Sequence, residues 1–135
     1  MPDVITLNCI VRGDIPPTQR AFTIDISPSK TIDYLRDAIK MKLSPRFDFI
    51  AANQLTLWKV DIPLDNPNDK LALLEASINF DIKDELGGNL LLPTRKIGKV
   101  FTGELIEEHI HVIAEYLYVP QTVDLLDINI PSADI

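Results

Sequence analysis

The chain has few features that would cross-link it or anchor it in a membrane. It has a single cysteine, Cys9, so no disulfide can form within it and nothing requires an oxidising compartment. No apolar run approaches the ~18 residues that a spanning helix needs. The opening segment MPDVITLNCIVRGD has an acid at position 3 and no basic stretch before a long apolar one. We therefore expect no classical signal peptide and no membrane span.

Clustered positive charge is also missing. The formal net charge is −7, from 13 lysines and arginines and 20 aspartates and glutamates. Residues 1–60 are nearly balanced, and the acidic excess lies in residues 61–135. Because a phosphate backbone is bound by clustered cations, we predict no nucleic-acid binding by this domain. Solvated acidic loops explain the second half.

Motifs for common chemistry are absent as well. Gly87-Gly88 and Gly98 match neither GxGxxG nor GxxxxGK[ST], and the chain ends Ser-Ala-Asp-Ile instead of the Gly-Gly that a conjugated modifier needs. Cys9 alternates with apolar residues, which predicts an inert core thiol. No nucleophile and base can be paired. We expect no catalytic residues, no cofactor and no enzyme activity.

What is present is the pattern of a small α+β protein. At 135 residues and 46% hydrophobic composition, the chain is long enough for one domain with its own core. Alternating apolar residues predict strands over 5–11 and 22–26, joined as a hairpin, and a helix then follows with Thr31 as its N-cap. A third strand is predicted over 55–60.

The second half is less regular. Asn68 is expected to cap a short helix over 69–76, with Leu71 and Leu74 facing inward. Residues 78–92 are interpreted as loop with a short helix or strand, 95–101 as a short strand or turn, and 108–117 as a final strand. The predicted domain covers residues 1–117, and 118–135 form a tail or linker.

This element order is that of the ubiquitin-like β-grasp, a mixed sheet packed on one main helix, here with an insertion in the second half. One face of the sheet is predicted to pack against Leu35 and Ile39 of the helix. The sheet residues assigned to this core are Ile5, Leu7, Cys9, Phe22, Ile24, Leu55 and Ile110.

Two segments carry a family resemblance. QLTLWKVDIP, residues 54–63, and LLLPTRKIGKVFTGELIEEHIHVIA, residues 90–114, resemble the N-terminal header domain of Crinkler effectors. Residues 7–11 occupy the place of the LFLAK motif but lack its lysine. The sequence from His111 resembles the start of HVLVxxP, although Pro120 comes nine residues after the histidine instead of six.

The resemblance implies a function in recognition. Crinkler headers are ubiquitin-like targeting and interaction modules of secreted effectors that act in host cells, often in the host nucleus, during symbiosis or virulence. It also implies a C-terminal effector domain beyond this chain. The alternative is an intracellular ubiquitin-like adaptor or regulatory domain of a larger protein.

An interaction face can be proposed from the strand phases. Ile10, Trp58 and Ile113 are predicted on the sheet face opposite the helix, together with His109 and His111. Exposed, they would form an apolar patch with a polar rim, which is typical of an interface. A patch that pairs with itself would give a homodimer. In the other interpretation, Trp58 turns inward or the 61–107 insertion covers this face.

The histidines also allow a metal-site hypothesis. Glu107, His109 and His111 would share one face of a strand and could offer three ligands to zinc. No fourth ligand is identifiable, so solvent-side histidines are the preferred interpretation and no metal is expected.

Overall fold

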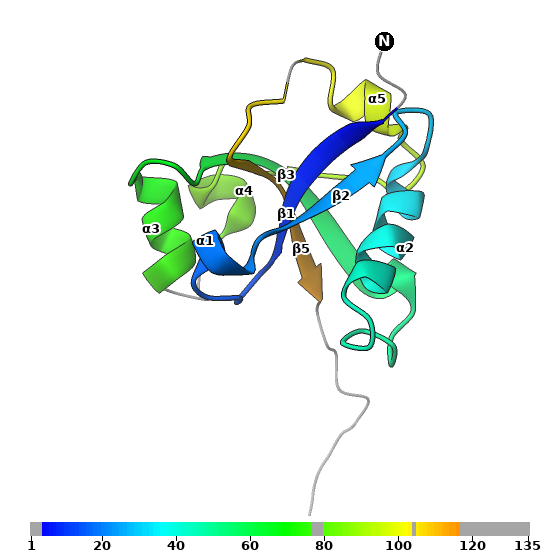
Figure 1. Cartoon of the computed structure of the whole chain (residues 1–135), viewed down its shortest axis with the longest axis horizontal. Coiled ribbons are helices and arrows are strands. Elements are labelled where there is room, and N and C mark those ends of the chain that lie inside the picture. Colours follow the sequence, from blue (N-terminus) through cyan, green and yellow to red (C-terminus); the bar gives the residue numbers. More distant parts are fainter. Residues whose placement is uncertain (1–3, 77–79, 104, 117–135) are drawn as a thin grey trace, which may run out of the picture.

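The computed structural model describes residues 4–76, 80–103 and 105–116 (Figure 1). The predicted tail, 118–135, lies outside them. The elements in chain order are β1 (Ile5–Val11), α1 (Pro17–Arg20), β2 (Phe22–Ile26), α2 (Ile32–Lys42), η1 (Ala52–Gln54), β3 (Leu55–Pro63), α3 (Asp69–Ala76), α4 (Ile82–Glu85), β4 (Asn89–Leu90), α5 (Ile97–Val100) and β5 (His109–Tyr116).

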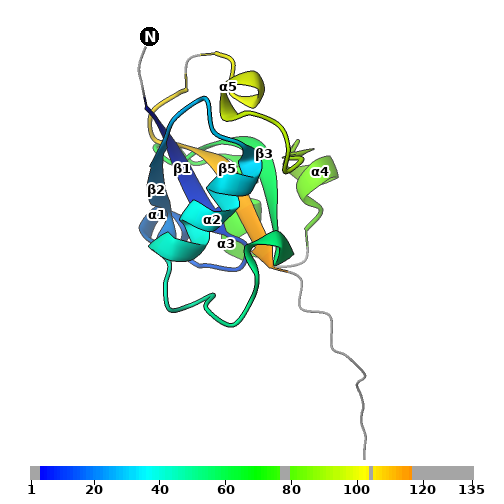
Figure 2. The same cartoon turned by 90° about the vertical axis from the view of Figure 1, so that its right-hand side faces the viewer.

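The strands form one mixed sheet in the order β2-β1-β5-β3-β4. β1 and β2 are an antiparallel hairpin, β5 lies parallel to β1, and β3 is antiparallel to β5. Figure 2 shows α2 lying across one side of this sheet. A hairpin, a crossing helix and a last strand inserted at the centre define the β-grasp, so the fold prediction is confirmed.

The α2 face of the sheet carries the predicted core. The Thr31 hydroxyl accepts a hydrogen bond from the Tyr34 N–H (3.3 Å) and caps α2, as expected. Leu35 and Ile39 are fully buried against apolar residues that alternate along the strands. The predicted members Leu7, Cys9, Ile24 and Leu55 are all in this cluster, with Ile5 and Phe22 packed at its margin.

The opposite face of the sheet carries a second core. The Asn68 side chain accepts from the Leu71 N–H (2.9 Å) at the start of α3, and Leu71 and Leu74 are buried as predicted. With α4 they cover the outer face, so α2 and the α3–α4 segment lie on opposite sides of the sheet (Figure 1). The second core contains Ile10, Val60, Ile62, Leu71, Leu74, Phe80, Ile82, Leu86, Ile110 and Ile113.

Ile110 was assigned to the wrong face. It belongs to the second core, whereas Val112 and Ala114, further along β5, belong to the α2 core. The cause is a bulge: Lys59 pairs with Val112 and Ile62 with Ile110, so β3 has one residue more than β5 in this interval. A bulge twists the strands locally and breaks the period of two.

Two further boundaries differ from the prediction. β3 continues to Pro63, which lies opposite His109. Residues 95–101 contain a one-turn helix, α5, where a short strand or turn was expected. The buried Ile97 donates its N–H to the Lys30 carbonyl (2.8 Å), which holds α5 against the turn before α2. That tertiary contact has no counterpart in the local sequence pattern.

Candidate binding groove

The predicted apolar patch is not on the surface. Ile10 is 1% exposed and Ile113 is 0% exposed, and both lie in the second core. They are on the predicted face of the sheet, but α3 and α4 cover that face. Ile113→Ser would therefore damage the core, and a homodimer through this face would lack its apolar centre. The prediction of an exposed Ile10–Trp58–Ile113 patch was wrong because the insertion packs onto it.

Trp58 is half-buried at the margin of the second core. Its indole N–H donates to a Glu115 carboxylate oxygen (3.3 Å), and Glu115 forms an ion pair with Arg12. The Arg12 guanidinium lies 4.4 Å from the centre of the Phe80 ring and donates to the Phe80 carbonyl. We call Arg12, Trp58, Phe80 and Glu115 the clamp, because it ties the segment before α4 to β1, β3 and β5.

His109 and His111 have separate partners. His109 Nδ1 contacts the carboxylate of the exposed Asp61 on β3. His111 is buried, and its Nδ1 accepts from the Asn8 N–H of β1 (2.9 Å). The other ring nitrogen must then carry the proton, and Nε2 donates to the Ile106 carbonyl (2.9 Å). His111 thus ties the loop of residues 101–108 to β1.

This environment favours the neutral imidazole. Burial lowers the pKa of His111, and His109 adds to that effect, while the Ile106 carbonyl and Asp61 oppose it. Protonation would put a second N–H against the Asn8 N–H, where an acceptor is required. Neutral His111 is therefore part of the sheet structure.

The histidines are not arranged as a metal site. Both nitrogens of His111 are engaged, and His109 is paired with Asp61. In the part of the chain that the structure describes, no three histidine, cysteine or acidic side chains converge on a common point. Glu107 instead lines a cavity with His111.

That cavity is an open groove of about 920 Å³, bounded by the start of β1, the α1–β2 segment and the 101–108 loop. A second cavity of about 210 Å³ lies under the same loop, and Phe101, Ile106 and His111 line both. The apolar part of the larger wall consists of Val4, Ile5, Ala21, Phe22, Leu64, Phe101, Leu105 and Ile106.

Two polar side chains of the groove bond to neighbouring parts of the sheet. Thr6 donates its hydroxyl proton to Asp25 (2.6 Å), and the Asn8 side-chain amide donates to the His109 carbonyl (2.8 Å). Of the charged residues lining the groove, Glu107 and Glu108 are both acidic and exposed. Such a groove offers apolar contact and negative charge to a ligand.

Two of the residues that line the groove were singled out from the sequence, His111 for the interaction face and Glu107 as a possible zinc ligand. Phe22 was assigned to the core, and Phe101 and Ile106 were given no role. The wall brings together residues 4–8, 18–23, 64 and 101–108. A weak signal did exist, because the apolar pair Leu105-Ile106 directly precedes the polar segment Glu107-Glu108-His109.

A β2-β1-β5-β3-β4 sheet crossed by one main helix places the molecule among the ubiquitin-like β-grasp domains. Within that class, the family model of the Crinkler effector protein N-terminal domain matches residues 5–115. The chain belongs to this Crinkler family. The matched range coincides with the folded unit from β1 to β5.

A curated relative agrees with this assignment. The chain is 33% identical over 111 residues to Crinkler effector protein 1 of Rhizophagus irregularis, an alignment that covers 82% of this chain and 21% of the relative. The chain thus spans about a fifth of that protein's length.

Among solved structures, a domain of AFD-1, isoform a, from Caenorhabditis elegans is similar with a TM-score of 0.44 and 16% identity. The match covers 82% of this chain and 93% of that one. The strand order, and not this distant likeness, defines the fold. None of the helices among the described residues is long and apolar enough to cross a bilayer.

Proposed function

We propose that this chain is the non-enzymatic N-terminal targeting and protein-interaction module of a secreted Crinkler-type effector that acts in host cells. The observation that carries the proposal is the family match, which runs over residues 5–115 and so includes every strand of the sheet. The module would direct or dock a longer protein whose remaining length lies outside this chain.

The chemistry of the described surface supports a binding role. The groove is lined by apolar residues, neutral polar residues and two glutamates, and its histidine uses both nitrogens to hold the fold. The Cys9 thiol is buried at the sheet centre, and burial raises its pKa to about 12, so it is not a nucleophile at neutral pH. Recognition through a surface groove is the activity that these residues can perform.

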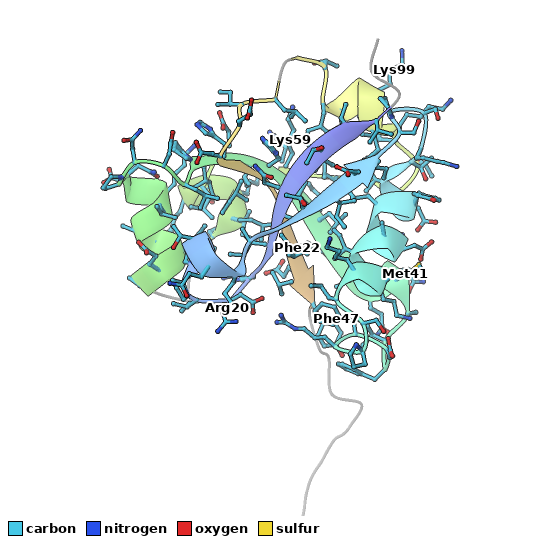
Figure 3. All side chains as sticks on the ribbon, in the orientation of Figure 1. Arg20, Phe22, Met41, Phe47, Lys59 and Lys99 are labelled. Atoms are coloured by element: carbon cyan, nitrogen blue, oxygen red, sulfur yellow. The ribbon has the colours of Figure 1, made fainter. Side chains whose placement is uncertain are left out.

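Delivery can be tested with the full-length effector. One fragment of a split fluorescent protein is fused to the effector in the producing organism, and the other fragment is expressed in recipient cells. We expect fluorescence in recipient cells for the natural protein and none for Leu35→Asp, which destroys the α2 core. Met41→Asp is the matched control, because Met41 is 77% exposed on the outer side of the same helix (Figure 3).

Absence of fluorescence in recipient cells, with stable full-length effector present in the producing organism, would refute delivery and favour the intracellular adaptor. A catalytic role is tested separately with the purified chain. Hydrolase or transferase turnover by this chain would overturn the non-enzymatic assignment.

A further inference from the structure

The two edges of the sheet differ in how they are protected from pairing with a strand of another chain. β4 is two residues long, and a very short strand is a common way to blunt an edge. β2 is five residues long, pairs with β1 on one side, and has no strand on its other side in the described part of the chain. Its sequence, FTIDI, contains neither proline nor lysine, two residues that often block edge pairing.

The groove begins at this open edge. Phe22 and Thr23 belong to β2 and also line the groove, and Ala21 precedes them in the wall. Alternate residues of an edge strand direct their N–H and carbonyl groups outward, where a further strand can pair with them. A strand added to β2 would direct every second side chain into the groove.

The groove has the character of a site for side chains that are apolar or basic. Thr6, Asn8 and His111, three of the polar residues that line it, already have partners within the fold. The walls are apolar, and the charged lining residues are Glu107 and Glu108, without a lysine or arginine among them.

The neighbouring cations do not neutralise this rim. Lys59 donates to the Val100 carbonyl (2.8 Å) and lies over the Phe101 ring, at the top of the view in Figure 3. Arg20 lies at the lower end of the same view, away from the α5–β5 loop. Asp25 on β2 is exposed and adds a carboxylate to the edge itself.

From this edge and groove we propose a docking site for an extended segment of a partner protein, with apolar side chains at alternate positions and basic residues flanking them. The segment pairs with the outward side of β2 and places its apolar side chains against Phe22, Leu105 and Ile106. Its basic residues lie near Glu107 and Glu108. The proposal rests on the interaction role proposed above but not on delivery, and purified protein tests it.

The probe is a capped synthetic peptide with a five-residue core, in which valine alternates with threonine, and two lysines at each end. Binding is followed by amide chemical shifts of the isotope-labelled chain. We expect saturable shifts confined to β2, the start of β1 and the 101–111 segment. A peptide of the same composition with its valines in one block should bind more weakly, and glutamates in place of the lysines should abolish binding.

Backbone pairing is tested by N-methylation. Methylating alternate peptide nitrogens removes the donors on one edge of the peptide and leaves the other edge intact. One of the two methylated peptides should lose binding and its counterpart should retain it. Equal binding of both would refute strand addition.

Two variants of the chain test the groove. Gly103→Trp should block it while the fold is kept, because a Cβ at Gly103 would meet nothing within 4 Å. Glu107→Gln with Glu108→Gln should weaken peptide binding by roughly two- to tenfold at low salt and less at high salt. Asp37→Asn with Glu75→Gln is the matched control, because it removes two exposed carboxylates elsewhere and should leave binding unchanged.

Several results would overturn the proposal. One is a set of chemical-shift changes that map to another surface. Another is an equal loss of peptide affinity in the groove charge variant and in its control. A third is unchanged peptide binding by Gly103→Trp. Absence of shifts at millimolar peptide would also refute it. If the same residues shift with protein concentration in the absence of peptide, the occupant is a second copy of the chain, and the proposed partner is wrong.

Discussion

The two faces of the sheet are both buried, but they are built differently. On one face, α2 is a helix of 11 residues with a regular apolar stripe, and it rests on strands that alternate cleanly. On the other face, α3 and α4 have 8 and 4 residues and are joined to the sheet partly by the clamp. A local periodic pattern is thus sufficient for the first layer, whereas the second depends on specific side chains far apart in sequence.

Because of this difference, the candidate binding surface lies at an edge of the sheet and not on its outer face. A β-grasp with a single helical layer would leave the outer face of its sheet open, which was one of the two interpretations that the sequence allowed. Here that face is used for a second core, and the accessible groove lies at the β2 edge and under the 101–108 loop. The insertion therefore changes which part of the fold can meet a partner.

The largest expected effect tests the α2 face. Leu35→Asp would bury an unpaired carboxylate in a site with no exposure, and we expect loss of the cooperative fold. Circular dichroism and urea unfolding measure it. Met41→Asp on the same helix should change stability little, and a folded Leu35→Asp protein would contradict the assigned core.

The second face should respond more weakly and more locally. Leu74→Ala removes a buried side chain from α3, and we expect a cost of about 2–4 kcal/mol in the free energy of unfolding. Hydrogen exchange should show faster exchange in α3 and α4 than in β1 and β2. The exposed Glu75→Ala serves as control. Equal acceleration throughout the sheet would mean that both faces unfold as one unit.

The clamp can be tested by a double-mutant cycle. Arg12→Met and Glu115→Gln each remove one partner of the ion pair, and their combined cost should be smaller than the sum of the single costs. We expect a coupling of roughly 1–2 kcal/mol, because the pair is mostly buried and shares Trp58 and Phe80. A coupling near zero would mean that the Arg12–Glu115 ion pair does not help to stabilise the second layer.

His111 should make stability depend on pH. Because its pKa is lowered in the folded state, the unfolded chain binds the proton more readily. Stability is then complete above the ordinary histidine pKa of about 6.5 and falls as the pH drops from there toward the folded-state pKa. Urea midpoints at several pH values measure this.

Three other titratable groups near His111 could contribute to the pH dependence of stability: Asp61, Glu107 and His109. His111→Gln should flatten the pH dependence in that window, at a cost in stability at neutral pH. His109→Gln keeps the Asn8–His111–Ile106 connection and should largely preserve the dependence. The reverse result would assign the pH effect to the His109–Asp61 pair.

The smallest expected effect is that the Cys9 thiol does not react in the native protein. Cys9 is buried in the α2 core, and burial raises its pKa to about 12, so iodoacetamide should not modify it in the native protein at pH 8. Mass spectrometry measures the modification. Since Cys9 lies on the α2 face, labelling should accelerate in Leu35→Ala more than in Leu74→Ala. The comparison of the two labelling rates distinguishes local opening of the α2 face from opening of the second face.

Most of the fold could be predicted because its signals are local. The hairpin, the Thr31 cap and the Asn68 cap each depend on residues within a few positions of one another. Ile110 could not be placed, because the bulge that reverses its face lies on another strand. α5 could not be predicted because Ile97 is fixed by the Lys30 carbonyl, 67 positions earlier in the chain.

The candidate site was harder to predict. The strand phases of Ile10, Trp58 and Ile113 were correct, yet their exposure depended on whether α3 and α4 cover that face. That coverage is a tertiary event with no local signal. The groove is assembled from four separate segments, and of the residues that line it the sequence marked only His111 and Glu107 as candidate functional residues.

The position of β5 has a consequence for synthesis. β5 is the last strand that the structure describes, but it lies between β1 and β3 in the sheet. Until residue 116 has left the ribosome, both of those strands have an open edge, and the hairpin, α2 and β3 cannot close into one sheet. During translation the nascent chain therefore exposes one open edge on β1 and one on β3 until β5 emerges, and open strand edges favour association with other chains.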